Sequence, residues 1–291
     1  MSVLFTFEAK NPLDFPSWTF ETLDIEYEPR TRSLWMYYKD EAPPFYSMQT
    51  LSDMASVRES VRALFASPII RAFPIRYFVM ASRKPGVFQL GGDLGMFAST
   101  IRKREREILR VYAHACIDVI FGLATAFDLT VVTLSVITGQ ALGGGLEAAL
   151  AQDFVMADET AQLGVPEVAF NTFPGMGAVT LLTRRLGTAS SETIITSGDI
   201  YSGKQMYDLG VVDIMAAAGE ARNTALVWMG EDEERHVRRL NTAALRRHVF
   251  PISHEELIKI TDVWVECSSE VSPQDIRHME RLATAQRRKF A

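Results

Sequence analysis

Short apolar runs of strand-forming residues alternate with longer helical stretches through the first three quarters of the chain. This alternation constrains the fold more than any other feature of the sequence. The runs expected to form strands are residues 73–82, 129–137, 154–157 and 211–214. The stretches expected to form helices are residues 52–66, 94–126, 145–151 and 177–186. Strands that alternate with helices are typical of parallel β-α units, so the sequence predicts an α/β fold.

Strand signals vanish from about residue 217 onward, and three helical windows follow one another. They cover residues 234–248, 255–268 and 273–289. Their apolar positions need a surface to cover them, either on the rest of the chain or on a second subunit. The clearest of these positions are Ile258, Val263, Trp264 and Met279. We therefore expect a core over residues 1–216 and a helical region over residues 217–291 that takes part in self-association.

The composition excludes several classes of protein. The 291 residues are 47% hydrophobic, which is enough apolar material for a large core. Lys and Arg number 30 against 36 Asp and Glu, and the net charge of -6 argues against duplex nucleic acid as a partner. The two cysteines, Cys116 and Cys267, and the five histidines lack the spacing of a disulfide framework or a metal site. Without a leader-like start or an apolar run of about 18 residues, we expect a cytoplasmic protein with no membrane insertion.

Two glycine-bearing loops, at residues 90–94 and 141–150, each follow an expected strand and lead into an expected helix. A residue without a Cβ lets a ligand approach the backbone closely, and a helix N-terminus presents unpaired N–H groups to negative charge. Both loops are therefore suited to hold an anion or a polarised carbonyl oxygen. Ordinary turn glycines are the alternative explanation for either loop.

The second loop also matches the form of a dinucleotide-binding fingerprint. Gly143, Gly145 and Ala148 follow a strand, and the acidic residue Glu167 lies at a suitable distance downstream. The helix after Gly145 is short for an ordinary crossover, and Glu167 follows Pro166 instead of ending a clean strand. These features argue against a nucleotide-dependent oxidoreductase, which we keep as an alternative.

Two glutamates indicate that the second loop is more than a simple turn. Glu147 follows Gly144 by three positions, so its carboxylate lies on the helix face beside any group that the Gly144 N–H contacts. A first-turn acid that offsets the helix dipole is the alternative explanation for Glu147. Glu167 stands alone among the apolar and turn residues of segment 163–177, where a merely solvating charge is unexpected. Two carboxylates on separate elements, together with two glycine amides, indicate a reaction site.

Taken together, these residues resemble the crotonase (enoyl-CoA hydratase/isomerase) superfamily over residues 73–215. The matching motifs are Gly-Gly-Asp-Leu at 91–94, Ala-Leu-Gly-Gly-Gly-Leu-Glu at 141–147, Gly-Val-Pro-Glu at 164–167, Phe-Pro-Gly-Met-Gly at 173–177 and Leu-Gly-Val-Val-Asp at 209–213. The resemblance implies a spiral of β-β-α units with a C-terminal helical region that covers the active site, assembled as trimers or dimers of trimers.

The resemblance also implies roles for individual residues. Gly92 and Gly144 would donate the two amides of an oxyanion hole, and Glu147 and Glu167 would form the acid-base pair. By the same analogy, Glu167 handles the α-carbon proton and Glu147 the water or hydroxyl. No cofactor is implied, since coenzyme A or an acyl carrier protein acts only as the carrier of the acyl thioester substrate.

Within the superfamily the chain is most similar to the bacterial synthases of diffusible signal factor, a cis-2-unsaturated fatty acid. The similarity lies in residues 91–94, in Phe-Pro-Gly-Met-Gly-Ala at 173–178, and in the tail from Ile260 to Leu282. It implies dehydration of 3-hydroxyacyl thioesters followed by release of the unsaturated acid. An ordinary enoyl-CoA hydratase and a catalytically silent scaffold of the same fold are the alternatives.

Further residues near these motifs have two explanations each. An acyl tunnel and plain core packing both account for the apolar side chains Leu142, Phe170, Phe173, Met176 and Trp264. A contact with the carrier and a solvated helix face both account for the basic cluster Arg102, Lys103, Arg104 and Arg106.

Overall fold

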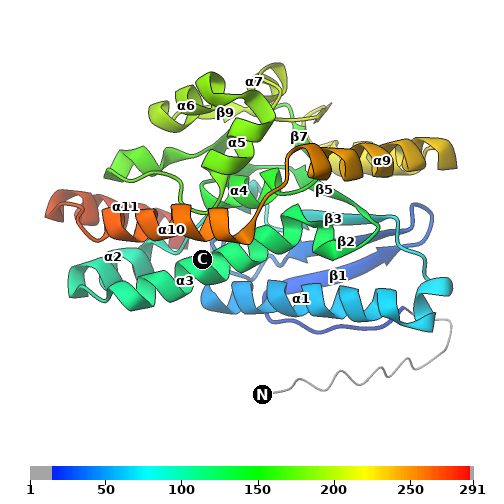
Figure 1. Ribbon diagram of the computed structural model, residues 1–291, viewed down its shortest axis with the longest axis horizontal. Helices are drawn as coiled ribbons and strands as arrows, with labels where there is room; N and C mark the ends of the chain where they lie inside the picture. Colours follow the sequence, from blue (N-terminus) through cyan, green and yellow to red (C-terminus); the bar gives the residue numbers. More distant parts are fainter. Residues whose placement is uncertain (1–14, 289–291) are drawn as a thin grey trace.

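The computed structural model describes residues 15–288 as a mixed α/β protein in which helices surround two β-sheets (Figure 1). The larger sheet has the strand order β1-β2-β3-β5-β7-β10. Its strands are β1 (Leu23–Glu28), β2 (Ser33–Tyr38), β3 (Tyr77–Ser82), β5 (Val132–Ile137), β7 (Phe154–Asp158) and β10 (Ile214–Ala216). The smaller sheet has the order β4-β6-β8-β9. Its strands are β4 (Val87–Gln89), β6 (Gln140–Leu142), β8 (Gln162–Gly164) and β9 (Ile200–Ser202).

From β3 to β8, successive strands alternate between the two sheets, so the chain follows a spiral. Strands β3, β5 and β7 are parallel neighbours in the larger sheet. Strands β4, β6 and β8, which follow them in turn, are parallel neighbours in the smaller sheet. Antiparallel pairs occur only at the edges, between β1 and β2 and between β8 and β9 among the described residues. The predicted α/β class and the spiral of β-β-α units are confirmed.

The helices lie on both faces of the larger sheet and around the smaller one. They are α1 (Met48–Ala66), α2 (Leu94–Lys103), α3 (Arg106–Ala124), α4 (Gly144–Leu150), α5 (Ala178–Leu186), α6 (Thr188–Ser197), α7 (Gly203–Asp208), α8 (Ala221–Met229), α9 (Glu233–Val249), α10 (His254–Ser268) and α11 (Pro273–Arg288). Short 3-10 helices are η1 (Pro68–Arg71), η2 (Ala126–Asp128) and η3 (Pro166–Phe170).

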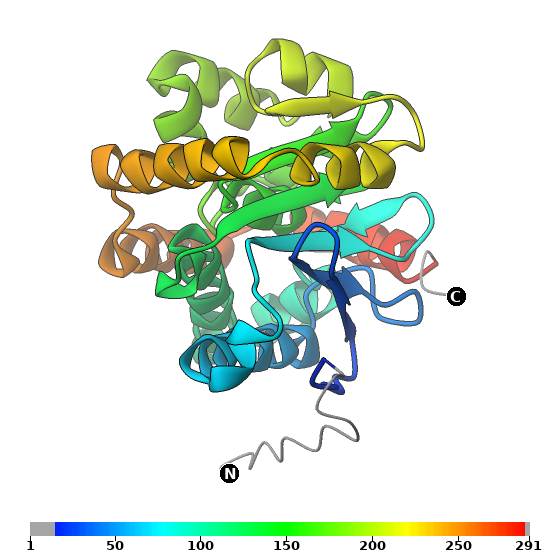
Figure 2. The ribbon, with the colours of Figure 1, turned by 90° about the vertical axis from the view of Figure 1, so that its right-hand side faces the viewer.

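Strand β2 illustrates why the molecule has two apolar cores. All of its residues are buried, and successive side chains of a strand point to opposite faces of the sheet. Leu34 and Met36 therefore enter the larger core, whereas Trp35 and Tyr37 enter the smaller one. Helix α8 packs over the smaller core and α9 runs beside it, in yellow and orange in Figure 2. Because such strands are covered on both faces, they appear in the sequence as continuous apolar runs.

The three C-terminal windows predicted as helices are confirmed as α9, α10 and α11. Helix α10 packs along α3, and α11 packs along α2 (Figure 1). Trp264 and Met279 are buried in the larger core and Ile258 packs against it, whereas Val263 is 54% exposed on this chain. None of the described helices is long and apolar enough to cross a membrane.

The single helix predicted over residues 94–126 is wrong, because two helices occupy that stretch. Arg104 has a left-handed backbone with φ of 59° and ends α2, and α3 begins two residues later. The Arg104 N–H donates to the carbonyl oxygens of Thr100 and Ile101, which closes the last turn of α2. No glycine or proline marks the break, so the sequence pattern predicts one continuous helix across it.

The strand predicted at residues 211–214 is also misplaced, since β10 begins only at Ile214. The Val211 and Val212 amides both donate to the Met206 carbonyl oxygen, so these residues close the end of α7 instead of pairing in a sheet. Both valines are buried, which explains their strand-like composition. The edge strand β1 and its neighbour β2 were not predicted.

Candidate active site

One cavity of about 270 Å³ receives both predicted carboxylates. Its walls come from the loop after β4, from β6 and the loop after it, from η3 and the turn before α5, and from helices α2, α4, α10 and α11. The lining residues are Leu90, Gly92, Leu94, Phe97, Gln140, Leu142, Gly143, Gly144, Glu147, Pro166, Glu167, Phe170, Gly175, Met176, Trp264, Leu282, Ala285 and Gln286. Segments between Leu90 and Gln286, far apart in the sequence, therefore meet at this one place.

Glu147 is held by backbone donors from a distant turn. It lies in the first turn of α4 and is 1% exposed. Its Oε1 accepts hydrogen bonds from Met176 N at 2.9 Å and from Ala178 N at 2.8 Å. Between these two residues Gly177 has a φ of 125°, a conformation that favours glycine and turns both amides toward the carboxylate. The Phe-Pro-Gly-Met-Gly motif and the alanine that follows it thus fix the position of the Glu147 carboxyl group.

Glu167 stands in a different environment at the start of η3. Parts of the residue reach the surface, but its Oε2 is buried and has no hydrogen-bond partner within residues 15–288. A Cβ at Gly143 would lie only 2.5 Å from Glu167 Oε1. The backbone of the second glycine loop therefore passes directly against this carboxyl group, which explains the need for glycine at position 143.

Burial raises the pKa of both carboxyl groups, and the two environments separate them. For Glu147, desolvation raises the pKa, and the two backbone donors oppose part of the rise because they stabilise the ionised form. For Glu167, desolvation raises the pKa and the negative charge of Glu147 raises it further. Glu147 is therefore the member that ionises first, and Glu167 is the member that keeps its proton. The site holds a base and an acid side by side.

The Gly92 amide is directed into the cavity by a contact on its far side. Tyr46 N donates to Gly91 O at 2.8 Å, and Gly91 has a φ of 85°. A peptide group is planar and trans, so the Gly92 N–H points away from Tyr46. Among the described residues, no acceptor takes the Gly92 N–H.

The Gly144 amide completes a pair of donors. As the first residue of α4, Gly144 has no acceptor for its N–H inside the helix. A Cβ at Gly91 would lie 2.8 Å from Gly144 N, so the two loops touch. Gly92 and Gly144 therefore bring two amides to the wall of the cavity that also carries the two carboxyl groups, and an oxyanion hole requires such a pair of donors.

Four of the five predicted acyl-tunnel residues line the cavity. They are Leu142, Phe170, Met176 and Trp264. The fifth, Phe173, is partly buried against the larger core and is not among the lining residues of this cavity. A Cβ at Gly175 would lie 2.3 Å from Trp264 Cγ, so the Glu147 turn packs directly on α10.

Several residues of the site carried no sequence signal. Gln286 of α11 donates from Nε2 to Leu90 O at 3.2 Å and to Gly92 O at 3.1 Å. Tyr46, which contacts the same loop through Gly91, is itself held by Tyr112, whose OH donates to Tyr46 O at 2.6 Å. These contacts join residues that are far apart in the chain, and no local motif marks them.

The basic cluster of residues 102–106 lies outside the cavity lining. Arg102 pairs with Glu280 of α11 at 2.7 Å, and Arg106 pairs with Glu266 of α10. Both arginines are partly exposed, and Lys103 is exposed. Half of the cluster therefore fastens the C-terminal helices to α2 and α3.

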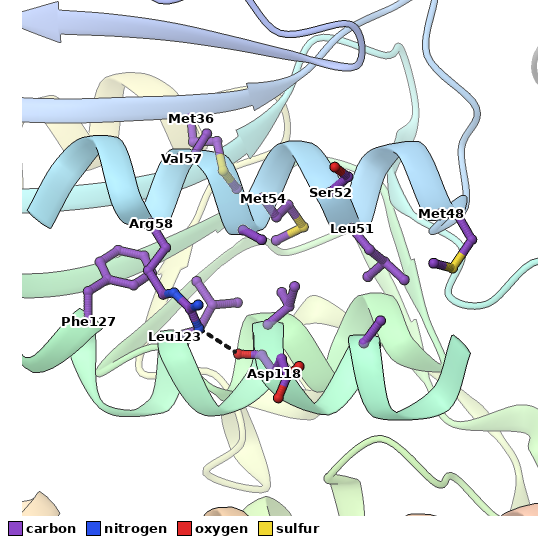
Figure 3. A pocket seen from close by; sticks show the side chains of 13 residues that line it. Met36, Met48, Leu51, Ser52, Met54, Val57, Arg58, Asp118, Leu123 and Phe127 are labelled. Carbon is purple, nitrogen blue, oxygen red and sulfur yellow. Dashed lines mark hydrogen bonds between the residues drawn. The ribbon is translucent and has the colours of Figure 1, made fainter. Parts of the chain in front are cut away.

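A separate cavity of about 190 Å³ lies between α1 and α3 (Figure 3). Met36, Met54 and Leu123 give it an apolar interior, and Arg58 donates to Asp118 O at 3.5 Å at its side. It contains neither a carboxylate pair nor a glycine loop, so we assign no chemistry to it.

Comparison with known proteins identifies the family to which this chain belongs. The family model described as enoyl-CoA hydratase/isomerase matches residues 71–278. The chain belongs to the enoyl-CoA hydratase/isomerase family, and the predicted superfamily is confirmed.

Curated relatives share the family domain over part of their length. The fatty acid oxidation complex subunit alpha of Pseudomonas paraeruginosa is 30% identical over 188 residues, which is 65% of this chain and 24% of that protein. The Arabidopsis thaliana protein named Probable enoyl-CoA hydratase 2, mitochondrial, is 32% identical over 152 residues, which is 52% of this chain and 48% of that protein. The chain thus spans about a quarter of the first relative and about half of the second.

Solved structures resemble the fold at low sequence identity. An enoyl-CoA hydratase from Bacillus halodurans has a TM-score of 0.72 at 16% identity and covers 90% of this chain and 100% of its own. DspI from Pseudomonas aeruginosa has a TM-score of 0.61 at 23% identity and covers 92% of this chain and 96% of its own. At these identities the similarity shows a shared fold.

Proposed function

We propose that this chain interconverts 3-hydroxyacyl thioesters and 2-enoyl thioesters by removing or adding water. One observation carries the proposal. The carboxyl groups of Glu147 and Glu167 share one cavity with two unpaired glycine amides. An acid, a base and an oxyanion hole are the groups that this reaction requires.

In the direction of hydration, the thioester carbonyl oxygen accepts hydrogen bonds from Gly92 N and Gly144 N. Ionised Glu147 removes a proton from water as the water oxygen bonds to the β-carbon. The electron pair of the double bond moves toward the carbonyl, and the negative charge develops on the oxygen held by the two amides. Protonated Glu167 then delivers its proton to the α-carbon.

Dehydration runs through the same steps in reverse, so Glu167 removes the α-proton and Glu147 protonates the departing hydroxyl. The separation of the two pKa values supports the starting states for hydration, in which Glu147 is ionised and Glu167 is protonated, and dehydration starts from the reverse states. The amides of Met176 and Ala178 favour ionised Glu147, and no donor favours ionised Glu167 at its Oε2 within the described chain.

We also propose that the acyl product leaves as a free cis-2-unsaturated acid. The motifs at residues 91–94 and 173–178 and the tail from Ile260 to Leu282 favour this over simple hydration. In such a step Glu147 would activate water for attack on the thioester carbonyl carbon, in the same oxyanion hole. A C–O bond forms, the C–S bond breaks, and the carrier thiol leaves with a proton. Simple hydration, with the thioester left intact, is the second candidate.

Product analysis by mass spectrometry tests both proposals. Purified protein is incubated with 3-hydroxyacyl and 2-enoyl thioesters of several chain lengths, each on coenzyme A and on an acyl carrier protein. Glu147→Gln and Glu167→Gln serve as controls for contaminating enzymes. Free unsaturated acid supports the synthase, and water addition without acid release supports the hydratase. Unchanged substrates in the whole panel would refute both and favour a silent scaffold.

We further propose that the chain self-associates, as the family resemblance implies. Val249 and Val263 expose 66% and 54% of their surface on the C-terminal helices, and Phe250 exposes 48%. Such apolar side chains favour a protein partner. Light scattering on the eluting protein tests the expected trimer or dimer of trimers, and a monomer would contradict it.

A further inference from the structure

The first glycine loop, residues 90–94, here called the oxyanion loop, accepts hydrogen bonds on two sides. Gly91 O accepts from Tyr46 N on one side. Leu90 O and Gly92 O accept from the single side-chain amide of Gln286 on the other. Glycine backbones have no side-chain restraint on φ and ψ, so a loop with two consecutive glycines needs such outside contacts to hold one geometry. Gln286 provides two of the three contacts to the carbonyl oxygens of residues 90–92, and the amides at the ends of the loop are held separately, since Leu90 N donates to Pro44 O and Asp93 N to the Tyr112 hydroxyl.

The orientation of the Gln286 amide follows from its partners. The side chain is 7% exposed and two carbonyl oxygens face it, so only its NH₂ group can point toward the loop. Its Oε1 is buried and accepts no hydrogen bond within the described residues. A buried polar group left without a partner costs free energy, and such groups in native structures call for an explanation.

The position of the contact in the loop matters for the donor geometry. The peptide between Gly91 and Gly92 carries the cavity-facing N–H, and the next peptide carries the Gly92 oxygen that Gln286 holds. Fixing the oxygen on one side of Gly92 and the Gly91 oxygen on the other fixes both peptide planes that flank its Cα. The direction of the Gly92 N–H is then determined.

Helix α11 contributes more than this one side chain. Leu282 and Ala285 line the same cavity, so the helix that holds the oxyanion loop also closes the site. The Arg102–Glu280 pair joins α11 to α2 at the surface, away from the loop. Removal of the α11 contacts would therefore open the cavity and release the loop together.

We infer that Gln286 is a positioning residue that couples the seating of α11 to the geometry of the oxyanion hole. The Tyr46 contact sets the direction of the peptide that carries the Gly92 N–H, and Gln286 holds the peptide before it and the peptide after it, so the donor keeps this direction while α11 is in place. This inference rests on the proposed function for its kinetic consequence, since it assumes that the amides of Gly92 and Gly144 bind the thioester oxygen. Its structural consequence, an ordered loop, does not depend on the activity.

Gln286→Leu and Glu280→Gln form the test pair. The first removes both contacts to the loop, and the second removes the exposed pair with Arg102 and leaves the loop contacts intact. With crotonyl-CoA as the probe, Gln286→Leu should lower kcat by about 10- to 100-fold, because a catalytic group moved by about 1 Å can cost about 100-fold and a misdirected donor costs less than the loss of the donor. KM should change by less than about threefold, because the interaction acts mainly in the transition state. Glu280→Gln should keep the wild-type kcat.

Hydrogen exchange of the free protein gives an independent readout. Peptides that cover residues 88–96 should exchange faster in Gln286→Leu than in the wild type and in Glu280→Gln. Gln286→Glu adds a third measurement. Its ionised carboxylate repels two carbonyl oxygens, whereas its protonated form donates to one of them. Its kcat relative to the wild type should therefore rise as the pH falls from 8 to 6.

The outcomes separate the inference from the proposed function. Equal kcat losses in Gln286→Leu and Glu280→Gln would overturn the inference, and so would unchanged exchange of residues 88–96. If the wild type hydrates none of the thioesters but Gln286→Leu still speeds exchange, the proposed function fails and the positioning role stands. A Gln286→Leu protein that does not fold is replaced by Gln286→Glu, whose pH-dependent kcat and exchange decide the question.

Discussion

Substitution of Gly143 by alanine probes the contact between the second glycine loop and the Glu167 carboxyl group. The new Cβ would lie 2.5 Å from Glu167 Oε1, whereas ordinary contact begins at 3.4 Å. The carboxyl oxygen must retreat by about 0.9 Å, and a displacement of about 1 Å can cost about 100-fold in rate. Gly143 also has φ of 51° and ψ of -127°, and alanine in such a conformation costs about 1–3 kcal/mol.

We therefore expect Gly143→Ala to lose about 100-fold in kcat with crotonyl-CoA and about 1–3 kcal/mol in the free energy of unfolding. Steady-state kinetics and urea unfolding measure the two effects. Gly187→Ala is the matched control, because Gly187 also has a positive φ of 79° but a Cβ there meets nothing within 4 Å. The control should lose stability and keep kcat. Similar kcat values for the two variants would refute the proposed contact with Glu167.

Other substitutions test the remaining parts of the site and fold. Glu147→Gln and Glu167→Gln should each lower turnover by at least about 100-fold, the scale of lost acid-base catalysis, and near-normal hydration by either would contradict its role. Because burial raises the pKa of Glu167, the folded state binds its proton more tightly than the unfolded state does, and the carboxyl group destabilises the fold increasingly as the pH rises above about 4.5. Glu167→Gln should therefore raise the melting temperature at pH 8 and leave it unchanged at pH 4, and an equal shift at both values would count against this argument. Asp153→Ala removes a buried carboxylate that accepts from Thr133 N at 2.8 Å and pairs with Arg247, so calorimetry or urea unfolding should show a loss of about 3 kcal/mol. An unchanged stability would show that this pair adds nothing to the fold.

Local patterns in the sequence were sufficient for much of the architecture. Strands β3, β5 and β7 are buried on both faces, and continuous apolar runs mark them. The three C-terminal helices have clear helical windows. Strands β1 and β2 were missed. The break at Arg104 was missed too, since it involves neither glycine nor proline and depends on how α2 and α3 pack.

For the site, the sequence motifs were sufficient to identify the two glycine loops and the two glutamates. The position of Glu147 three residues after Gly144 needs only the geometry of one helix turn, so it followed from spacing alone. The motifs were also sufficient for the family.

The environment that makes these residues work came from contacts across the fold. Backbone amides at positions 176 and 178 stabilise ionised Glu147, and the charge of Glu147 raises the pKa of Glu167. Gln286 reaches the oxyanion loop from a helix 194 positions along the chain. Hydrogen bonds of this kind join groups whose separation depends on the packing of whole elements, and burial strengthens them only after that packing exists. No local pattern of residues encodes such distances, so the chemistry of the pair became visible only in the folded molecule.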